Sequence, residues 1–236
     1  MAREEEQEEA MSEIADNLAA VRSRIARAAA SAGRDPGEIK LIAVSKTKPG
    51  AAVREAYLAG QRAFGENYAQ ELAAKAEALA DLADIEWHFI GHLQTNKAKV
   101  AAKHASVVHT VDSSALAGEL GKRAAKERAT PMPVLIEVNV GGEAQKAGAT
   151  PGEIDEVMAA VRAQPSLDLC GLMTVPPAGN TTGARRVFET LATLRNLHGG
   201  VARLPELSMG MSDDLEAAVE CGATLVRVGT AIFGAR

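Results

Sequence analysis

The sequence predicts an α/β protein, a single (β/α)8 TIM barrel with an extra N-terminal helix. Eight short apolar runs alternate with amphipathic stretches, which is the pattern of parallel strands joined by right-handed helical crossovers. Eight such units fit a chain of 236 residues as one closed barrel, and no linker or change of composition divides the chain. An open doubly wound sheet is the alternative fold.

The expected strands are short apolar runs bounded by turn residues. They cover residues 41–45, 61–65, 86–91, 106–111, 134–140, 167–173, 206–209 and 224–229. Between them, apolar residues recur every three or four positions and therefore share one face of a helix. These faces carry Val53 and Tyr57; Tyr68, Leu72 and Leu79; Leu116 and Leu120; Ile154, Val157 and Val161; Val187, Leu191 and Leu194; and Leu215 and Val219. In the stretch 97–103 we expect only a solvated lysine face.

The chain starts with an acidic segment. Residues 1–9 hold five glutamates against one arginine, which accounts for −4 of the formal net charge of −5. We expect residues 1–11 to form a flexible acidic extension. A helix over about 12–32 follows, because Ile14, Leu18, Val21 and Ile25 form one apolar stripe. The barrel domain then covers residues 12–236.

Composition excludes several classes of protein. Cys170 and Cys221 lie in apolar surroundings without ligand spacing, so we expect free thiols and no metal site. No basic stripe with interleaved aromatic residues indicates a nucleic-acid partner. No apolar run is long enough to cross a bilayer, and no signal peptide is evident. We therefore expect a cytoplasmic protein with no nucleic-acid or membrane partner.

Lys46 follows the first predicted strand, at the end of the barrel where barrel enzymes carry their chemistry. An ammonium beside an apolar core is costly, so such a lysine either finds a partner or lowers its pKa. A deprotonated lysine is a nucleophile toward aldehydes. The plain alternative is a lysine that extends its charge into water.

The last two strand ends favour the chemical interpretation. Ser208 and Gly210 offer a hydroxyl group and an open backbone, and Gly229 lets backbone amides approach an anion. Thr230 begins a short predicted helix at the place where barrels commonly bind phosphate. A lysine beside a phosphate site fits a phosphorylated aldehyde, either pyridoxal 5'-phosphate (PLP) or the phosphosugar of an aldolase.

The chain resembles the pyridoxal-phosphate homeostasis protein family, single-domain relatives of the alanine racemase barrel. The segments that carry the resemblance run from near residue 12 to the end of the chain. They are AVSKTK (43–48), FGEN (64–67), WHFIGHLQ (87–94), VNV (138–140) with Glu143, Lys146 and Gly148, GLM (171–173), LSMGMSDD (207–214) and VRVGTAIFG (226–234).

The resemblance implies a role for each matching residue. Lys46 would hold PLP as an aldimine, and Arg227 would face the pyridine nitrogen. Ser208, Gly229 and Thr230 would hold the phosphate, with Gly210 in the same loop. The remaining matches, Asn67 and Met209, would line the ring pocket. An arginine at the ring nitrogen disfavours its protonation and so weakens carbanion chemistry.

The expected function is therefore PLP homeostasis, meaning storage, buffering or delivery of the cofactor, by a monomer without dedicated enzymatic turnover. PLP is the expected ligand, and apo forms of PLP-dependent enzymes are candidate recipients. The alternative is a PLP-dependent amino-acid racemase, which needs a second base on the ring face opposite Lys46. Only Tyr57 and Tyr68 could supply a tyrosine. A Schiff-base aldolase is the third possibility.

Overall fold

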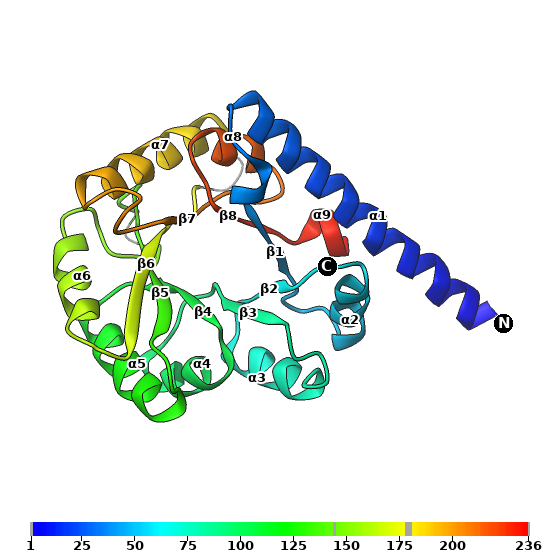
Figure 1. Cartoon of the computed structure of the whole chain (residues 1–236), viewed down its shortest axis with the longest axis horizontal. Helices are drawn as coiled ribbons and strands as arrows, with labels where there is room; N and C mark the ends of the chain where they lie inside the picture. Colours follow the sequence, from blue (N-terminus) through cyan, green and yellow to red (C-terminus); the bar gives the residue numbers. More distant parts are fainter. Residues whose placement is uncertain (1, 144, 178–180, 236) are drawn as a thin grey trace.

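The computed structural model, which describes residues 2–143, 145–177 and 181–235, is a closed barrel of eight parallel strands in sequence order (Figure 1). This confirms the predicted (β/α)8 fold over the open sheet. The strands are β1 (Lys40–Val44), β2 (Ala63–Glu66), β3 (Glu86–Phe89), β4 (Val107–Val111), β5 (Met132–Glu137), β6 (Leu167–Met173), β7 (Glu206–Ser208) and β8 (Leu225–Val228). β1 pairs with both β2 and β8, which closes the ring.

The helices surround this ring (Figure 1). They are α1 (Ala2–Ser31), α2 (Gly50–Leu58), α3 (Ala69–Ala78), α4 (Ala98–His104), α5 (Ser114–Glu127), α6 (Ile154–Arg162), α7 (Thr181–Leu197), α8 (Leu215–Glu220) and α9 (Thr230–Phe233), with 3-10 turns η1 (Pro36–Glu38) and η2 (Thr95–Lys97). The sequence did not predict α4. Its buried face consists of Ala98, Ala101 and Ala102, whose small side chains give a weak apolar pattern.

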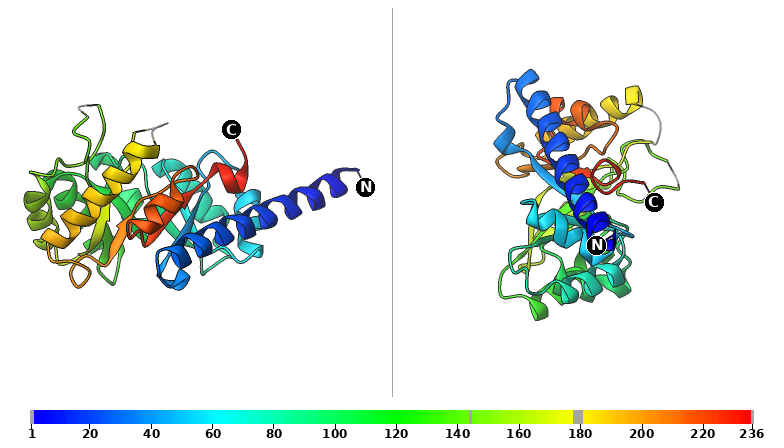
Figure 2. Two further views of the ribbon diagram at one scale, coloured as in Figure 1. Left: turned by 90° about the horizontal axis from the view of Figure 1, so that it is seen from above. Right: turned by 90° about the vertical axis from the view of Figure 1, so that its right-hand side faces the viewer.

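Helix α1 starts ten residues earlier than the predicted helix, because the backbone is helical from Ala2 (Figure 2). Its predicted apolar stripe is buried at Leu18, Val21 and Ile25. Asn17 Nδ2 donates to the Ile232 carbonyl of α9 at 3.1 Å. The helix therefore packs against the side of the barrel next to α9.

β5 starts at Met132, before the predicted position 134. Proline cannot donate a hydrogen bond within a sheet, so Pro133 is unusual inside a strand. In the structure Pro133 lies next to an irregularity in the β5–β6 register, between Val134 and Leu135, where a missing donor is tolerated.

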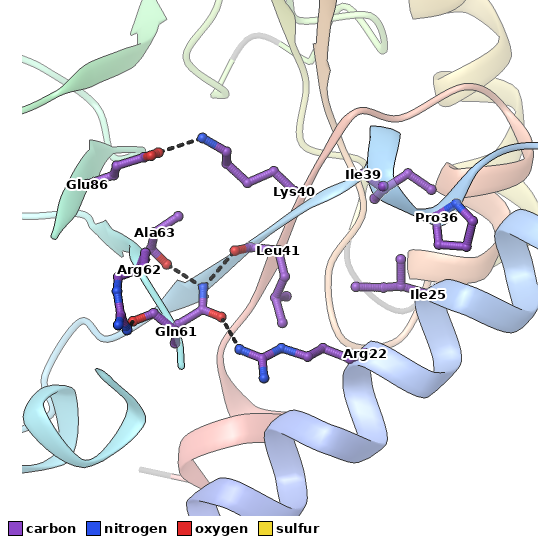
Figure 3. Close-up of a pocket in the computed structure, with 11 residues that line it drawn as sticks. Arg22, Ile25, Pro36, Ile39, Lys40, Leu41, Gln61, Arg62, Ala63 and Glu86 are labelled. Carbon is purple, nitrogen blue, oxygen red and sulfur yellow. Dashed lines mark hydrogen bonds and ion pairs between the residues drawn. The ribbon is translucent and has the colours of Figure 1, made fainter. Parts of the chain in front are cut away.

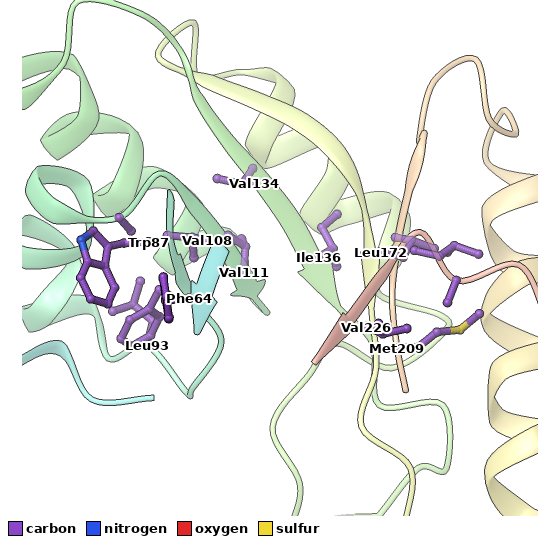
Figure 4. Close-up of a cluster of buried hydrophobic side chains, with 14 of the residues drawn as sticks. Phe64, Trp87, Leu93, Val108, Val111, Val134, Ile136, Leu172, Met209 and Val226 are labelled. Atoms are coloured by element: carbon purple, nitrogen blue, oxygen red, sulfur yellow. The ribbon is translucent and has the colours of Figure 1, made fainter. Parts of the chain in front are cut away.

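Two apolar layers hold the barrel together. The larger layer packs between the strands and the helices, and Figure 4 shows part of it, including Phe64, Trp87 and Met209. The smaller layer fills the barrel interior with Ile42, Ala63, Leu135, Met173 and Leu225. No helix in the described part of the chain is long and apolar enough to cross a membrane.

Candidate functional site

A pocket of about 350 Å³ opens at the end of the barrel where the strands finish. We call it the C-terminal pocket. Its lining residues are Val44, Lys46, Asn67, Ile90, Val175, Met211, Ser212, Asp213, Arg227, Gly229 and Thr230. Segments that follow six of the strands, or end them, thus converge on one cavity. The fold brings together five of the eight predicted site residues: Lys46, Asn67, Arg227, Gly229 and Thr230.

Arg227 forms the charged inner wall of this pocket. Its side chain is almost fully buried at 4% exposure. Nη1 donates to Ser208 Oγ at 2.6 Å, and Nη2 donates to the Thr174 carbonyl at 2.9 Å. Burial lowers the pKa of Arg227 to about 10, against the opposing effect of Glu137 and Asp214. The guanidinium therefore stays charged at neutral pH and is held in one orientation.

A chain of hydrogen bonds runs from Arg227 through the barrel interior. Ser208 Oγ lies 2.8 Å from His109 Nδ1, and His109 Nε2 lies 2.9 Å from His88 Nδ1. The Ser208 hydroxyl accepts from Arg227 and keeps both its proton and a second lone pair for His109. Either neutral tautomer of His109 therefore completes the chain, and His88 takes the matching role at its Nδ1 atom. The chain links the arginine to two buried imidazole rings.

Both histidines are neutral at physiological pH. Burial lowers the pKa of His88, and it lowers the pKa of His109 further, with His88 and Arg227 adding to the effect. Both side chains lie in the barrel interior, since His88 is 2% exposed and His109 is fully buried. Arg227 therefore contacts only neutral acceptors, and its positive charge is not cancelled by direct contact with a carboxylate among the described residues.

Two hydroxyl groups lie together in the lining of the pocket. Thr230 Oγ1 donates to Ser212 Oγ at 3.0 Å. Gly229 directly precedes Thr230 and α9, and a Cβ atom there would lie 3.2 Å from the Val44 carbonyl oxygen. A larger residue at this position would press against the end of β1. The result is a polar corner of hydroxyl and backbone N–H donors suited to an anion.

Three predicted site residues do not line the pocket. The Ser208 hydroxyl is fully buried between Arg227 and His109, so it orients the arginine from inside the barrel. Met209 points the other way and packs in the outer apolar layer (Figure 4). Gly210 has φ of 92°, and a Cβ atom there would lie 2.5 Å from Ala218 Cβ. Gly210 therefore makes the turn that carries the chain to the pocket.

Sequence reasoning missed Ser212 as a site residue. Its position in the sequence could have indicated this role. Ser212 lies two residues after the turn at Gly210, and this turn brings the Ser212 hydroxyl to the mouth of the barrel. Ser208 is still inside β7, where alternate side chains point into the barrel. The serine after the turn is the one that reaches the pocket.

Few lining residues could move a proton. The described lining contains Lys46 and Asp213, and no tyrosine, histidine or cysteine. Tyr68 lines a neighbouring depression with Asn67 and His92, and its side chain is 54% exposed. The Tyr57 hydroxyl donates to Asp84 away from the pocket. Neither tyrosine is therefore placed to act as a second base.

Glu137 lies at the end of β5 beside the arginine. Its Oε2 atom is buried without a hydrogen-bond partner in the described part of the chain. Burial raises its pKa to about 7, Asp112 adds to this, and Arg227 opposes it. The carboxyl group therefore titrates near neutral pH.

A second pocket of about 430 Å³ lies at the N-terminal end of the strands (Figure 3). Its charged groups already have protein partners. Lys40 Nζ lies 2.5 Å from Glu86 Oε2, and Arg22 Nη2 donates to Gln61 Oε1 at 3.2 Å. These contacts tie α1 and β1 to their neighbours. Although this pocket is the larger one, its polar groups serve the fold, as is usual at this end of a barrel.

Comparison with known proteins places the chain in a family. The profile described as "Alanine racemase, N-terminal domain" matches residues 17–236. The pyridoxal phosphate homeostasis protein of Pseudomonas aeruginosa is 49% identical over 228 residues, which cover 96% of this chain and 97% of that protein. The protein of the same name from Escherichia coli K12 is 47% identical over 232 residues, which cover 96% and 98%.

Solved structures agree with these sequence matches. PipY of Synechococcus elongatus PCC7942 with PLP bound is 38% identical, with a TM-score of 0.80 over 94% of this chain and 100% of that chain. Alanine racemase from Corynebacterium glutamicum, at 20% identity and a TM-score of 0.69 over 96% of this chain and 62% of that one, shares the fold. The chain belongs to the pyridoxal phosphate homeostasis protein family.

Proposed function

We propose that the chain binds PLP in the C-terminal pocket, attached to Lys46, and serves in PLP homeostasis by storing, buffering or delivering the cofactor. The observation that carries this proposal is the meeting of Lys46, the Arg227 guanidinium and the Ser212–Thr230 hydroxyl pair around one cavity. The names of the relatives and the PLP bound to PipY support the same ligand.

The pocket fits this cofactor group by group. PLP presents an aldehyde, a pyridine nitrogen and a phosphate. Lys46 supplies an amine and Arg227 a buried cation with directed N–H donors. The corner formed by Ser212, Gly229 and Thr230 supplies donors for the phosphate. The buried Asn67 Oδ1 atom, which has no hydrogen-bond partner among the described residues, is a further polar group that a ligand could satisfy.

When bound, PLP would supply an aldehyde that a lysine amine such as that of Lys46 could hold covalently. The protein decides what happens beyond that attachment. Arg227 keeps a fixed positive charge where we place the ring nitrogen, so it disfavours protonation of that nitrogen. A ring that stays unprotonated is a poor electron sink. This supports holding the cofactor without using it.

No observation favours the racemase alternative. Proton removal and return on opposite faces of a ring need two bases. Apart from Lys46, the described pocket offers only Asp213, on the same loop as the proposed phosphate donors. We therefore keep the proposal of a PLP-holding protein without dedicated turnover. Delivery to apo PLP-dependent enzymes, a cytoplasmic location and a monomeric state are parts of the proposal.

Titration of the purified protein with PLP tests the ligand. We expect a visible absorption band that saturates at one equivalent per chain. Pyridoxine 5'-phosphate, which has an alcohol in place of the aldehyde, should compete for the site without producing the band. A triose phosphate should not compete. Competition by triose phosphate with no PLP band would favour the aldolase alternative and contradict the proposal.

A further inference from the structure

Helix α3 holds the peptide groups on both sides of Lys46. Before the lysine, the Ser45 carbonyl accepts from Lys75 Nζ at 2.6 Å. After it, the Thr47 N–H donates to Glu71 Oε1 at 2.6 Å. Lys75 and Glu71 are themselves paired at 2.8 Å, one turn apart on α3. One ion pair therefore fixes the backbone at both flanks of the proposed PLP lysine.

A buried carboxylate completes this arrangement. Glu66 is fully buried at the end of β2, and its Oε1 atom accepts from Lys75 Nζ at 2.7 Å and from Ser45 Oγ at 2.6 Å. Lys75 thus has three acceptors for its three N–H donors, in the Ser45 carbonyl, Glu66 and Glu71. We call Glu66, Glu71 and Lys75 the α3 clamp.

The clamp acts on a strained backbone position. Thr47 has a φ of 65°, and among the described non-glycine residues it alone has a positive φ. A β-branched residue avoids this conformation unless its surroundings impose it. The bond from the Thr47 N–H to Glu71 is a contact that imposes it. The strain is located at the residue that follows Lys46.

We infer that Glu71 and Lys75 are positioning residues for Lys46, which hold the lysine backbone in the conformation that aims the side chain into the C-terminal pocket. Their contacts are with the main chain at positions 45 and 47, so their effect on the cofactor is indirect. The inference rests on the proposed function, because it gives Lys46 its role. A small error in the position of a reacting group such as the Lys46 amine has a large effect on the rate. Fixing the two flanking peptide groups prevents such errors.

The test compares Glu71→Ala with Glu77→Ala. Glu77 lies on the same helix, and its side chain is 68% exposed, so it is a matched control. The rate of covalent attachment is measured by rapid mixing with PLP, and the affinity of the pocket is measured with pyridoxine 5'-phosphate. We expect Glu71→Ala to slow attachment by about tenfold or more, with the affinity for pyridoxine 5'-phosphate unchanged.

Two further variants keep the test decisive. Thr47→Gly in the Glu71→Ala background should recover part of the rate, because glycine adopts a positive φ without the clamp. Glu71→Gln keeps an acceptor for the Thr47 N–H and should lie between wild type and Glu71→Ala, and it carries the test if Glu71→Ala does not fold.

The inference is overturned if the Glu71 variants attach PLP as fast as Glu77→Ala. It is also overturned if both ligands weaken in parallel, since the clamp would then support the pocket as a whole. Failure of the proposed function looks different, because wild type itself would show no attachment.

Discussion

Two buried cations lie near the C-terminal pocket, and the protein compensates them in opposite ways. Lys75, 6% exposed, contacts two carboxylates, Glu66 and Glu71. Arg227, 4% exposed, contacts a serine hydroxyl and a backbone carbonyl, while Glu137 and Asp214 act on it only through space. The two cations are buried to a similar extent, but only Lys75 has carboxylates in direct contact.

The difference explains which cation can act on a ligand. The three N–H donors of Lys75 are all hydrogen-bonded, and its charge is compensated by Glu66 and Glu71. Lys75 therefore fixes the backbone and contributes little positive charge to the pocket. Arg227 is oriented by neutral partners, including the chain through Ser208 and His109, and so its charge remains directed at the pocket. Contact with a carboxylate immobilises a cation, and contact with neutral acceptors leaves its charge available.

Among the variants proposed here, removal of Lys75 should have the largest effect on stability. Lys75→Met leaves Glu66 buried without its cation, and we expect a loss of about 3–5 kcal/mol in the free energy of unfolding. Burial raises the pKa of Glu66, and Lys75 is its main opposing influence. The loss should therefore be smaller at acidic pH, where Glu66 can be buried protonated. Denaturant unfolding at several pH values measures this, with Lys103→Met on exposed α4 surface as the control. An equal, small loss in both variants would contradict it.

Glu137 tests the arginine side of the comparison. Its pKa in the folded protein is raised from 4.5 to about 7, so its contribution to stability is full below pH 4.5 and disappears as pH rises through 7. In the wild type, ionisation of Glu137 should lower the free energy of unfolding by up to about 3 kcal/mol between pH 4.5 and 7. Glu137→Gln should not show this loss, because glutamine does not ionise. Thermal unfolding against pH is the measurement, and Glu127→Gln on α5 is the control. Parallel curves for wild type and Glu137→Gln would show that Glu137 ionises normally.

Arg227→Lys separates charge from orientation. An ammonium group cannot span Ser208 and Thr174 as the planar guanidinium does, so we expect a loss of about 1–2 kcal/mol in stability. The absorption band of bound PLP should also become sensitive to pH, because the cation no longer lies at a fixed place. Arg123→Lys, on the surface of α5, should change neither property. A pH-independent band in Arg227→Lys would mean that the arginine does not face the ring.

The acidic start of α1 should matter least. Described contacts of α1 with the rest of the protein, such as Asn17 with Ile232 and Arg24 with Glu216, come from the part of the helix after residue 12. A chain that starts at Met11 should keep its stability within about 0.5 kcal/mol and should bind PLP equally well. Calorimetric unfolding and PLP titration of the two chains decide this. A marked loss of affinity would show that the acidic segment acts at the pocket.

The sequence predicted the barrel because alternating apolar runs specify parallel strands. It singled out Lys46 because an ammonium group directly after a buried strand is costly, whereas Arg227 was assigned from the resemblance to the family. Other features depend on the distance between separate segments. Whether Ser208 points inward or reaches the mouth depends on the length of β7, and the α3 clamp joins residues of β1, β2 and α3. Helix α4 was not predicted, because its buried face consists of alanines, which carry little apolar surface.

The most direct test of the account is the location of covalently fixed PLP. Borohydride reduction of the PLP-loaded protein, followed by peptide mass analysis, should find the label on Lys46 of the wild type and no label in a folded Lys46→Ala variant. Lys48 is the neighbouring alternative, but its Nζ donates to the Ala235 carbonyl at 2.9 Å. Label on Lys48, or label that persists in Lys46→Ala, would contradict the assignment of Lys46 as the residue that holds the cofactor.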